Sequence, residues 1–356
     1  MNKTHDAMIQ NLRLDSFTNF DNCNFTFSKG INVFIGKNGT GKTHVLKCIA
    51  ATISANNEFI TSTSQAKDKF ENLIAEKLIG YFKPEQLGRL VKRQQGRTTA
   101  KLELIIKNAE LIFSFATSSK ANVKIEKNDG IGRINSLYIP PREMFSLYEG
   151  FLGLVQNREI SFDETYIMLA KALDAPMLKG PRFEKVRDLI EPLENALDIK
   201  VIKENGRFYI KDNSGKMEAH LVAEGLRKLA SIMYLILNGE LSKNSVLFWD
   251  EPESNLNPAL IKVVASFIKL LAEQGVQVFI ATHDYLLTHL LSLYSEYRQI
   301  DKAPEMKFFC LAKNENGSIE KEEGETLIQI NNNPILEEYV HFYDLAKTYF
   351  DKSMKN

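Results

Sequence analysis

The feature that most constrains this chain is a glycine-rich segment between a predicted strand and a predicted helix. Residues 36–43 read Gly-Lys-Asn-Gly-Thr-Gly-Lys-Thr and match the phosphate-binding pattern GxxxxGK[ST]. An apolar run at residues 31–35 precedes the segment, and residues 42–54 follow it with apolar side chains at helical spacing. This order directs backbone N–H groups and a helix N-terminus at phosphate oxygens. We therefore expect an α/β protein that binds a phosphate-bearing ligand rather than a chance glycine turn.

Each residue type in this segment has a chemical reason. Glycines let the backbone turn so that its N–H groups face the ligand. Lys42 is expected to bridge the β- and γ-phosphates of a nucleotide, and the Thr43 hydroxyl to ligate Mg²⁺. The residues expected to contact the nucleotide are Gly36, Lys37, Asn38, Gly39, Thr40, Gly41, Lys42, Thr43 and His44.

Polar side chains follow two further apolar strands. Residues 246–249 lead directly to Asp250 and Glu251, and residues 276–281 lead to His283. Open α/β sheets bind ligands at the carboxyl edge of their strands, so these side chains are expected near the phosphate loop. We predict that Asp250 holds the metal, that Glu251 orients or deprotonates a water, and that His283 reaches the γ-phosphate. Lys42, Glu251 and His283 are the expected catalytic residues.

The order of predicted elements indicates an α/β core that an inserted segment interrupts. Strands without polar alternation, separated by helices, are typical of a parallel sheet covered on both faces. We predict a nucleotide-binding core in residues 1–55 and 240–356 and a mixed helical and β lobe in residues 56–239. Predicted helices cover 70–90, 162–173, 182–197, 223–237 and 258–273, and predicted strands cover 9–17, 23–27, 100–106, 110–115, 122–126, 137–139 and a hairpin over 199–210 that turns at Asn205-Gly206.

Composition excludes several classes of protein. Lys+Arg and Asp+Glu are each 45 and the net charge is zero, which excludes a generally basic nucleic-acid binder. The three cysteines, Cys23, Cys48 and Cys310, match no metal or redox spacing and suit a reducing compartment. The first residues do not resemble a secretory signal, and no stretch approaches the roughly 20 apolar residues of a membrane helix. We expect a cytoplasmic protein without membrane contact.

On these motifs the chain resembles ATPases of the ABC/SMC/RecF superfamily. It is most similar to the small stand-alone kind related to the ATPase parts of OLD-family nucleases and of Septu, PARIS and retron-type antiphage systems. Residues 250–258 read Asp-Glu-Pro-Glu-Ser-Asn-Leu-Asn-Pro, similar to the DEPE-x-x-LHP segment of that family. The resemblance implies an ABC-type ATPase head, with a mostly parallel sheet core flanked by helices and an inserted mixed lobe. It also implies ATP and Mg²⁺ as cofactors and a head-to-head dimer, or a higher oligomer, that sandwiches ATP.

The family's signature motif, LSxGxR, is similar to residues 221–228, and it implies that Ala223, Glu224, Gly225 and Arg227 face the partner's ATP. Ala223 stands where a serine usually contacts the γ-phosphate, so one charge-assisted hydrogen bond worth about 1.5–3 kcal/mol is missing and slow turnover is expected. Asn257 replaces the usual D-loop histidine. The Q-loop position, after residues 137–139, has no glutamine; either Glu143 or Arg142 takes that role, or the segment is a rigid turn.

Two segments are candidates for contact with partners. Residues 86–101 contain basic side chains and no acid, which indicates either a nucleic-acid or acidic-partner contact or, more commonly, a solvated surface. Their basic residues are Arg89, Lys92, Arg93, Arg97 and Lys101. The predicted helix at residues 334–350 is expected to cap the core, with docking of a partner as the alternative.

We therefore predict an Mg²⁺-dependent ATPase that dimerises on ATP and, in antiphage defence, regulates a separately encoded effector such as a nuclease. No nuclease constellation is found in this chain, and no heptad pattern long enough for an SMC arm is found in its middle segment. The alternative is a RecF-like clamp that binds DNA with ATP in repair or recombination. A transporter ATPase is disfavoured by the DEPE-x-x-L segment.

Overall fold

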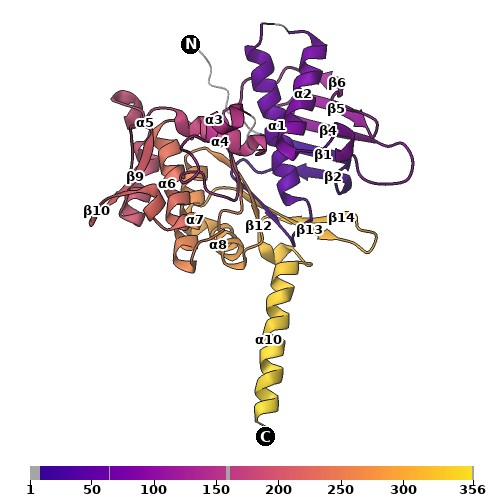
Figure 1. Ribbon diagram of the computed structural model, residues 1–356. Coiled ribbons are helices and arrows are strands. Elements are labelled where there is room, and N and C mark those ends of the chain that lie inside the picture. The colour runs from indigo at the N-terminus through magenta and orange to yellow at the C-terminus, as the bar shows by residue number, and fades with distance from the viewer. Residues whose placement is uncertain (1–8, 64, 158–160, 355–356) are drawn as a thin grey trace.

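The computed structural model describes residues 9–63, 65–157 and 161–354 and contains a central sheet of six strands (Figure 1). The strand order is β14-β13-β3-β12-β11-β7, and every neighbouring pair is parallel except β13 and β14. The strands are β3 (Ile31–Ile35), β7 (Ser136–Ile139), β11 (Val246–Asp250), β12 (Gln277–Thr282), β13 (Met306–Lys313) and β14 (Ile319–Gly324). The predicted parallel sheet, in the predicted α/β fold, is confirmed.

Alternating side chains of the central strands enter two different cores. All residues of β3, β11 and β12 are buried, as expected for a parallel sheet covered on both faces. Within β11, Val246 and Phe248 pack into one core, whereas Leu247 and Trp249 pack into the other. The central sheet is therefore the boundary between two apolar layers.

The first layer contains an antiparallel sheet and two helices. Its strand order is β2-β1-β4-β5-β6. Aromatic rings join this sheet to the central one; Phe27 lies 5.0 Å from Phe279 between ring centroids. The elements are β1 (Ile9–Phe17), β2 (Phe20–Thr26), β4 (Thr99–Ile106), β5 (Ala109–Ala116), β6 (Lys124–Asn128), α1 (Lys42–Thr61) and α2 (Lys67–Phe82). Because β1 pairs with both β2 and β4, the start of the chain and the middle segment share one sheet.

Helices and a small sheet cover the opposite face of the central sheet. The helices are α3 (Phe151–Gln156), α4 (Glu164–Asp174), α5 (Pro181–Leu197), α6 (Glu224–Leu237), α7 (Pro258–Glu273) and α8 (Tyr285–Glu296), and the sheet consists of β8 (Lys200–Glu204), β9 (Arg207–Asp212) and β10 (Gly215–Glu218). The predicted hairpin at Asn205-Gly206 is confirmed, since Glu204 pairs with Arg207 and both turn residues have positive φ.

The last long helix, α10 (Pro334–Ser353), projects from the body (Figure 1). None of its residues is buried, and all of them lie in the described part of the chain. The expectation that this helix caps the core is therefore wrong. Its apolar residues recur on one side, which is the pattern of a packed helix, but the partner of that side is not in the body.

The middle segment differs in detail from the prediction. Strands β4–β6 extend the sheet of β1 and β2, and β7 belongs to the central sheet, so residues 56–239 contribute to both sheets. The division of the chain into a core and an inserted lobe stays a prediction. The predicted helix at residues 70–90 ends at Phe82, because Lys83 is left-handed, and a short 3₁₀ turn follows at Leu87–Leu90. No helix within the described ranges is long and apolar enough to cross a bilayer.

Candidate nucleotide-binding site

The loop between β3 and α1 has a backbone that only glycine accommodates. Gly36, Gly39 and Gly41 have φ angles of 152°, 76° and 93°. A Cβ atom at Gly36 would lie 2.3 Å from the carbonyl oxygen of Leu311, and one at Gly41 would lie 2.7 Å from the ring of Phe20. The two glycines thus let the loop pass close to β13 and β2.

Lys42, the first residue of α1, is folded back into this loop. Its side-chain Nζ donates to the carbonyl oxygen of Gly36 at 2.6 Å and to that of Lys37 at 3.1 Å. Burial lowers the pKa of Lys42, and the charges of Asp250 and Glu251 oppose this effect. A buried ammonium group inside a cradle of backbone is the arrangement that a bound phosphate would complement. The loop residues therefore fit a nucleotide phosphate.

A hydroxyl and a carboxylate meet beside the loop, as the sequence predicts for a metal site. The Thr43 hydroxyl donates to Asp250 Oδ1 at 3.0 Å, and the Tyr138 hydroxyl donates to Asp250 Oδ2 at 3.2 Å. Burial raises the pKa of Asp250 to about 6, although the bond from Thr43 acts in the opposite direction. Oxygen donors of this kind are those that Mg²⁺ prefers. Thr43 and Asp250 would hold the ion.

Glu251 and His283 lie together where β11 and β12 end. The backbone N–H of Glu251 donates to the carbonyl oxygen of Ala281 at 2.8 Å, which fixes the two strand ends side by side. The side-chain Nδ1 of His283 is 3.6 Å from Glu251 Oε1 and 3.8 Å from Glu253 Oε1. Both Glu251 and His283 are partly exposed, so a ligand at the sheet edge can reach them.

Glu253 was not singled out by the sequence, but the structure gives it a central position. Its Oε1 accepts hydrogen bonds from the Thr282 hydroxyl at 2.7 Å and from the His283 backbone at 3.3 Å. Its Oε2 is buried and has no hydrogen-bond partner among the residues that the structure describes. Burial raises the pKa of Glu253. This carboxyl group therefore fixes the turn that presents His283.

Lys228 was also missed as a site residue, although it ends the signature segment. This lysine of α6 is only 2% exposed, and its ammonium group donates to the carbonyl oxygen of Glu251 and to the Ser254 hydroxyl. Burial lowers the pKa of Lys228 to about 8, while Glu253 and Glu251 act in the opposite direction. The sequence offered one signal for this role. Lys228 lies on α6 beside Leu229 and Ile232, which are buried, so a charged side chain at this position needs a buried partner.

The signature segment packs against residues 255–257 of its own chain, which we call the D-loop because they include the D-loop position Asn257. A Cβ atom at Gly225 would lie 2.6 Å from Leu256 Cδ2 and 2.8 Å from the carbonyl oxygen of Asn255. The Asn255 side chain also donates to Glu224 Oε1 at 2.8 Å. Asn257 caps α7, because its side chain accepts from the Leu260 N–H at 3.1 Å. Glycine at 225 thus permits a close internal contact.

Arg227 connects the signature segment with the predicted Q-loop position. Its guanidinium group donates to the carbonyl oxygen of Val222 at 2.5 Å and to Glu143 Oε1 at 2.9 Å. Glu143 is buried and also accepts from Ser146, whereas Arg142 is exposed. Ala223 is the N-cap of α6 and offers no side-chain acceptor to the first turn. A Q-loop role for Glu143 or Arg142 stays a prediction.

Two residues of the predicted nucleotide-contacting set have other neighbours. The ring of His44 packs on Phe82 at 5.5 Å between centroids, and burial lowers its pKa to about 4. His44 therefore faces α2, on the first layer. Lys37 is exposed and lies 3.9 Å from Glu338 of α10. The phosphate loop thus touches the base of the projecting helix.

The basic run does not form a field of one sign. Arg89 pairs with Glu85, Lys92 with Asp21, and Lys101 with Glu103 and Glu126. Arg93 and Arg97 are exposed in the loop before β4, and no ion pair of theirs is found within the described ranges. A role for the five residues in binding nucleic acid or a partner stays a prediction.

Comparisons with known proteins agree with this geometry. A protein-family model described as "AAA domain, putative AbiEii toxin, Type IV TA system" matches residues 31–288. No curated protein sequence matches the chain. An Smc head domain from Pyrococcus furiosus, solved with an extended coiled coil and bound to the C-terminal domain of ScpA, is similar at a TM-score of 0.54 and 13% identity, over 96% of this chain and 100% of that one. An SmcHead bound to the C-winged helix domain of ScpA is similar at 0.52 and 14%, over 89% and 97%. The predicted ABC-type head is confirmed as a fold.

Proposed function

The chain belongs to the AAA-domain family described as putative AbiEii toxin of type IV TA systems, within the ABC/SMC/RecF superfamily of ATPases, and from this premise we propose that it is an Mg²⁺-dependent ATPase. The observation that supports hydrolysis best is the contact between Thr43 and Asp250, with Glu251 and His283 at the same sheet edge. A phosphate loop alone binds nucleotide, whereas an acid pair beside it supplies groups for chemistry.

Each residue has a separate task in this proposal. Bound Mg²⁺ would neutralise phosphate charge, held by Thr43 and Asp250. Lys42 places its positive charge inside the loop, where it stabilises charge on the transferred phosphoryl group. Glu251 orients a water and accepts its proton, and His283, fixed by Glu253, donates a hydrogen bond toward the γ-phosphate. Lys228 donates a hydrogen bond to the backbone carbonyl oxygen of Glu251 and so positions that residue.

We propose further that two copies pair head to head on ATP. The first turn of α6 begins after Ala223 without a side-chain cap, and a helix N-terminus of this kind favours a phosphate of the facing copy. Leu221, the first residue of the signature segment, is 72% exposed, which suits a residue at such an interface. With alanine at 223, turnover is expected to be slow.

Regulation of a separate effector, such as a nuclease, in antiphage defence is the remaining part of the proposal. The family description supports a role in a toxin–antitoxin pair, and it allows the toxic activity to reside in this chain itself. Growth arrest on expression of the chain alone would favour that second arrangement. A RecF-like clamp has no specific support, because three of the five basic residues already pair with acids.

The test is Glu251→Gln, assayed by phosphate release and by light scattering with Mg²⁺ and ATP. Loss of the proton acceptor should lower kcat by about 10²-fold or more while ATP binding persists, so that an ATP-bound dimer accumulates. Glu218→Gln, an exposed acid on β10, is the matched control and should behave as the unmodified chain. An unchanged rate in Glu251→Gln would show that the catalytic assignment is wrong.

A further inference from the structure

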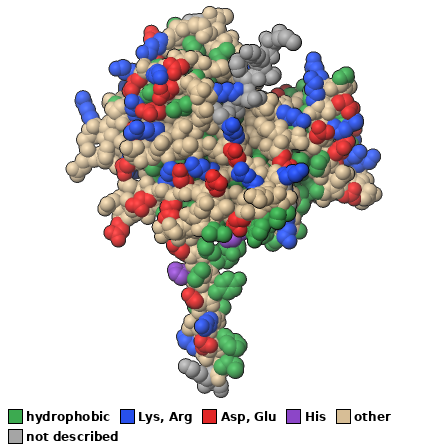
Figure 2. All heavy atoms as spheres, turned by 180° about the vertical axis from the view of Figure 1, so that it is seen from behind, with side chains coloured by type: hydrophobic (Ala, Val, Ile, Leu, Met, Phe, Trp, Pro, Cys, Tyr) green, Lys and Arg blue, Asp and Glu red, His purple; other side chains and the backbone are tan. Residues whose placement is uncertain are grey.

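The helix α10 exposes more apolar surface than an unpartnered helix in water normally does. Phe342, Tyr343 and Tyr349 are 63%, 69% and 66% exposed, and Leu345 and Phe350 are more than half exposed. Apolar side chains gather along one side of the projecting helix and around its base (Figure 2). Contiguous apolar surface of this kind marks an interaction site.

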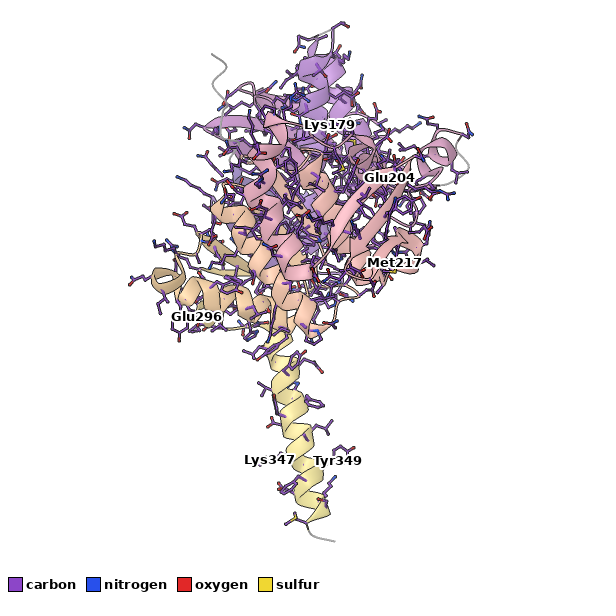
Figure 3. All side chains as sticks on the ribbon, turned by 90° about the vertical axis from the view of Figure 1, so that its left-hand side faces the viewer. Lys179, Glu204, Met217, Glu296, Lys347 and Tyr349 are labelled. Atoms are coloured by element: carbon purple, nitrogen blue, oxygen red, sulfur yellow. The ribbon has the colours of Figure 1, made fainter. Side chains whose placement is uncertain are left out.

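The apolar residues of α10 recur every seven residues. One line contains Ile335, Phe342 and Tyr349, a second contains Leu336, Tyr343 and Phe350, and a third contains Tyr339 and Ala346. The acids Glu337, Asp344 and Asp351 follow the same period on the opposite face. Lys347 and Tyr349 accordingly point to different sides of the helix (Figure 3). A seven-residue period is the signature of a helix that packs along another helix.

The charge of α10 excludes an anionic surface as its occupant. The helix contains four acids, Glu337, Glu338, Asp344 and Asp351, against two lysines, Lys347 and Lys352. Helices that lie on anionic membranes or along nucleic acid are basic on their polar face. An acidic helix with aromatic residues at heptad spacing instead fits a protein helix.

We propose that this helix is the α10 of a second copy of this chain, packed antiparallel. Pairing about the middle of the helix places Tyr339 of one copy against Tyr349 of the other, and Leu345 beside Leu345. The same register places Glu338 opposite the second copy's Lys352, twice per pair. A parallel pair leaves these charges unmatched and aligns the helix dipoles unfavourably. The helix is therefore self-complementary in one orientation only.

The base of α10 connects this contact with the nucleotide site. Glu338 lies 3.9 Å from Lys37 of the phosphate loop, and Tyr339 stacks on Tyr285 of α8 at 4.2 Å between centroids. In the antiparallel pair the second copy's Lys352 competes with Lys37 for Glu338. The interface goes beyond the proposed head-to-head dimer, because it uses a different surface and needs neither ATP nor hydrolysis.

Disulfide cross-linking tests the orientation in the nucleotide-free full chain. A mixture of the Tyr339→Cys and Tyr349→Cys chains, distinguished by a tag, should cross-link on oxidation, whereas each variant alone should not. In the antiparallel register like positions stand ten residues apart, about 15 Å along the helix, beyond the about 7 Å that a disulfide spans. The native cysteines are buried and should not compete. Cross-linking of each variant with itself would overturn the antiparallel arrangement.

Sedimentation measures the strength of the contact, in the unmodified chain and in a Lys42→Ala background that removes ATP-driven pairing. Phe342→Asp should raise the dissociation constant at least 100-fold, and Asp344→Asn, on the opposite face, should leave it unchanged. Glu338→Lys should weaken the pair several-fold, and adding Lys352→Glu should restore it. If the unmodified chain is a monomer at tens of micromolar, another protein is the occupant and the proposal is wrong.

Discussion

At the scale of single residues, the site sets two buried lysines, Lys42 and Lys228, against three acids. Asp250 ends β11, and Glu251 and Glu253 come after it; the ammonium group of Lys228 donates to the Glu251 carbonyl oxygen and to the Ser254 hydroxyl. Lys228 lies in α6 and bonds to the turn after β11, in which Glu251 and Glu253 lie outside regular strand or helix. Lys228 is therefore a positioning residue for Glu251, with no contact to the expected ligand.

This burial predicts a specific pH dependence. The pKa of Lys228 is lowered to about 8 in the folded chain and is near 10.4 when unfolded, so between these values the unfolded chain binds more protons. Stability attributable to Lys228 should therefore be lowest below pH 8 and rise toward pH 10.4, by an amount on the order of 3 kcal/mol. Urea unfolding of the unmodified chain and of Lys228→Met measures the difference.

Lys228→Met keeps the length of the side chain and removes the titrating group. The free energy of unfolding of the variant, minus that of the unmodified chain, should fall as pH rises from 8 to 10. Exposed Lys262→Met on α7 controls for general effects of alkaline pH. A difference between Lys228→Met and the unmodified chain that does not vary over this range would contradict the buried charge.

At the scale of elements, the contact of α6 with the D-loop fixes the signature segment relative to the acid pair that precedes the D-loop. Gly225→Ala places a methyl group 2.6 Å from Leu256 Cδ2 and 2.8 Å from the Asn255 carbonyl oxygen. Alanine favours the helix by about 1 kcal/mol, but the overpacked contact costs about 1–3 kcal/mol. We expect lower stability in urea and a fall in ATPase rate.

Gly153→Ala in α3 is the matched control, because a Cβ there has no neighbour within 4 Å. It should raise stability slightly through helix propensity and leave the ATPase rate unchanged. Equal behaviour of the two variants would show that the α6 contact with the D-loop is dispensable.

The elements that the sequence predicted well are those encoded locally. The strand–loop–helix around Lys42 and the apolar strands β11 and β12 follow from short-range pattern and glycine placement. The positions of β13 and α8 were not anticipated, because their sheet and core neighbours lie far away along the chain. The ion pairs of Lys92 with Asp21 and of Lys101 with Glu126 could not be predicted either, because these acids come from other strands. Only the fold brings such partners together.

At the scale of the whole molecule, the site lies where distant segments of the chain meet. Lys42 and Thr43 begin α1, whereas Asp250 ends β11 and His283 follows β12, more than 200 residues later. These strands are neighbours in one sheet, and that sheet separates the two cores. A ligand that contacts these residues therefore binds at the sheet on which both layers pack. Its binding should raise the free energy of global unfolding rather than only protect one local segment.

Thermal unfolding with Mg²⁺ and ATP tests this link. Ligand at about 100 times its dissociation constant stabilises a protein by about 2.7 kcal/mol, which predicts a rise in melting temperature of about 2–4 °C. Lys42→Ala should abolish the rise, and EDTA should reduce it, because Thr43 and Asp250 lose the ion that links them. If the melting temperature still rises with ATP in Lys42→Ala, the nucleotide binds elsewhere. If EDTA does not reduce the rise in the unmodified chain, the assignment of the metal site is wrong, but that of the phosphate loop still holds. The Lys42→Ala variant thus tests the phosphate loop, and EDTA tests the metal site. Both tests use the same measurement of melting temperature.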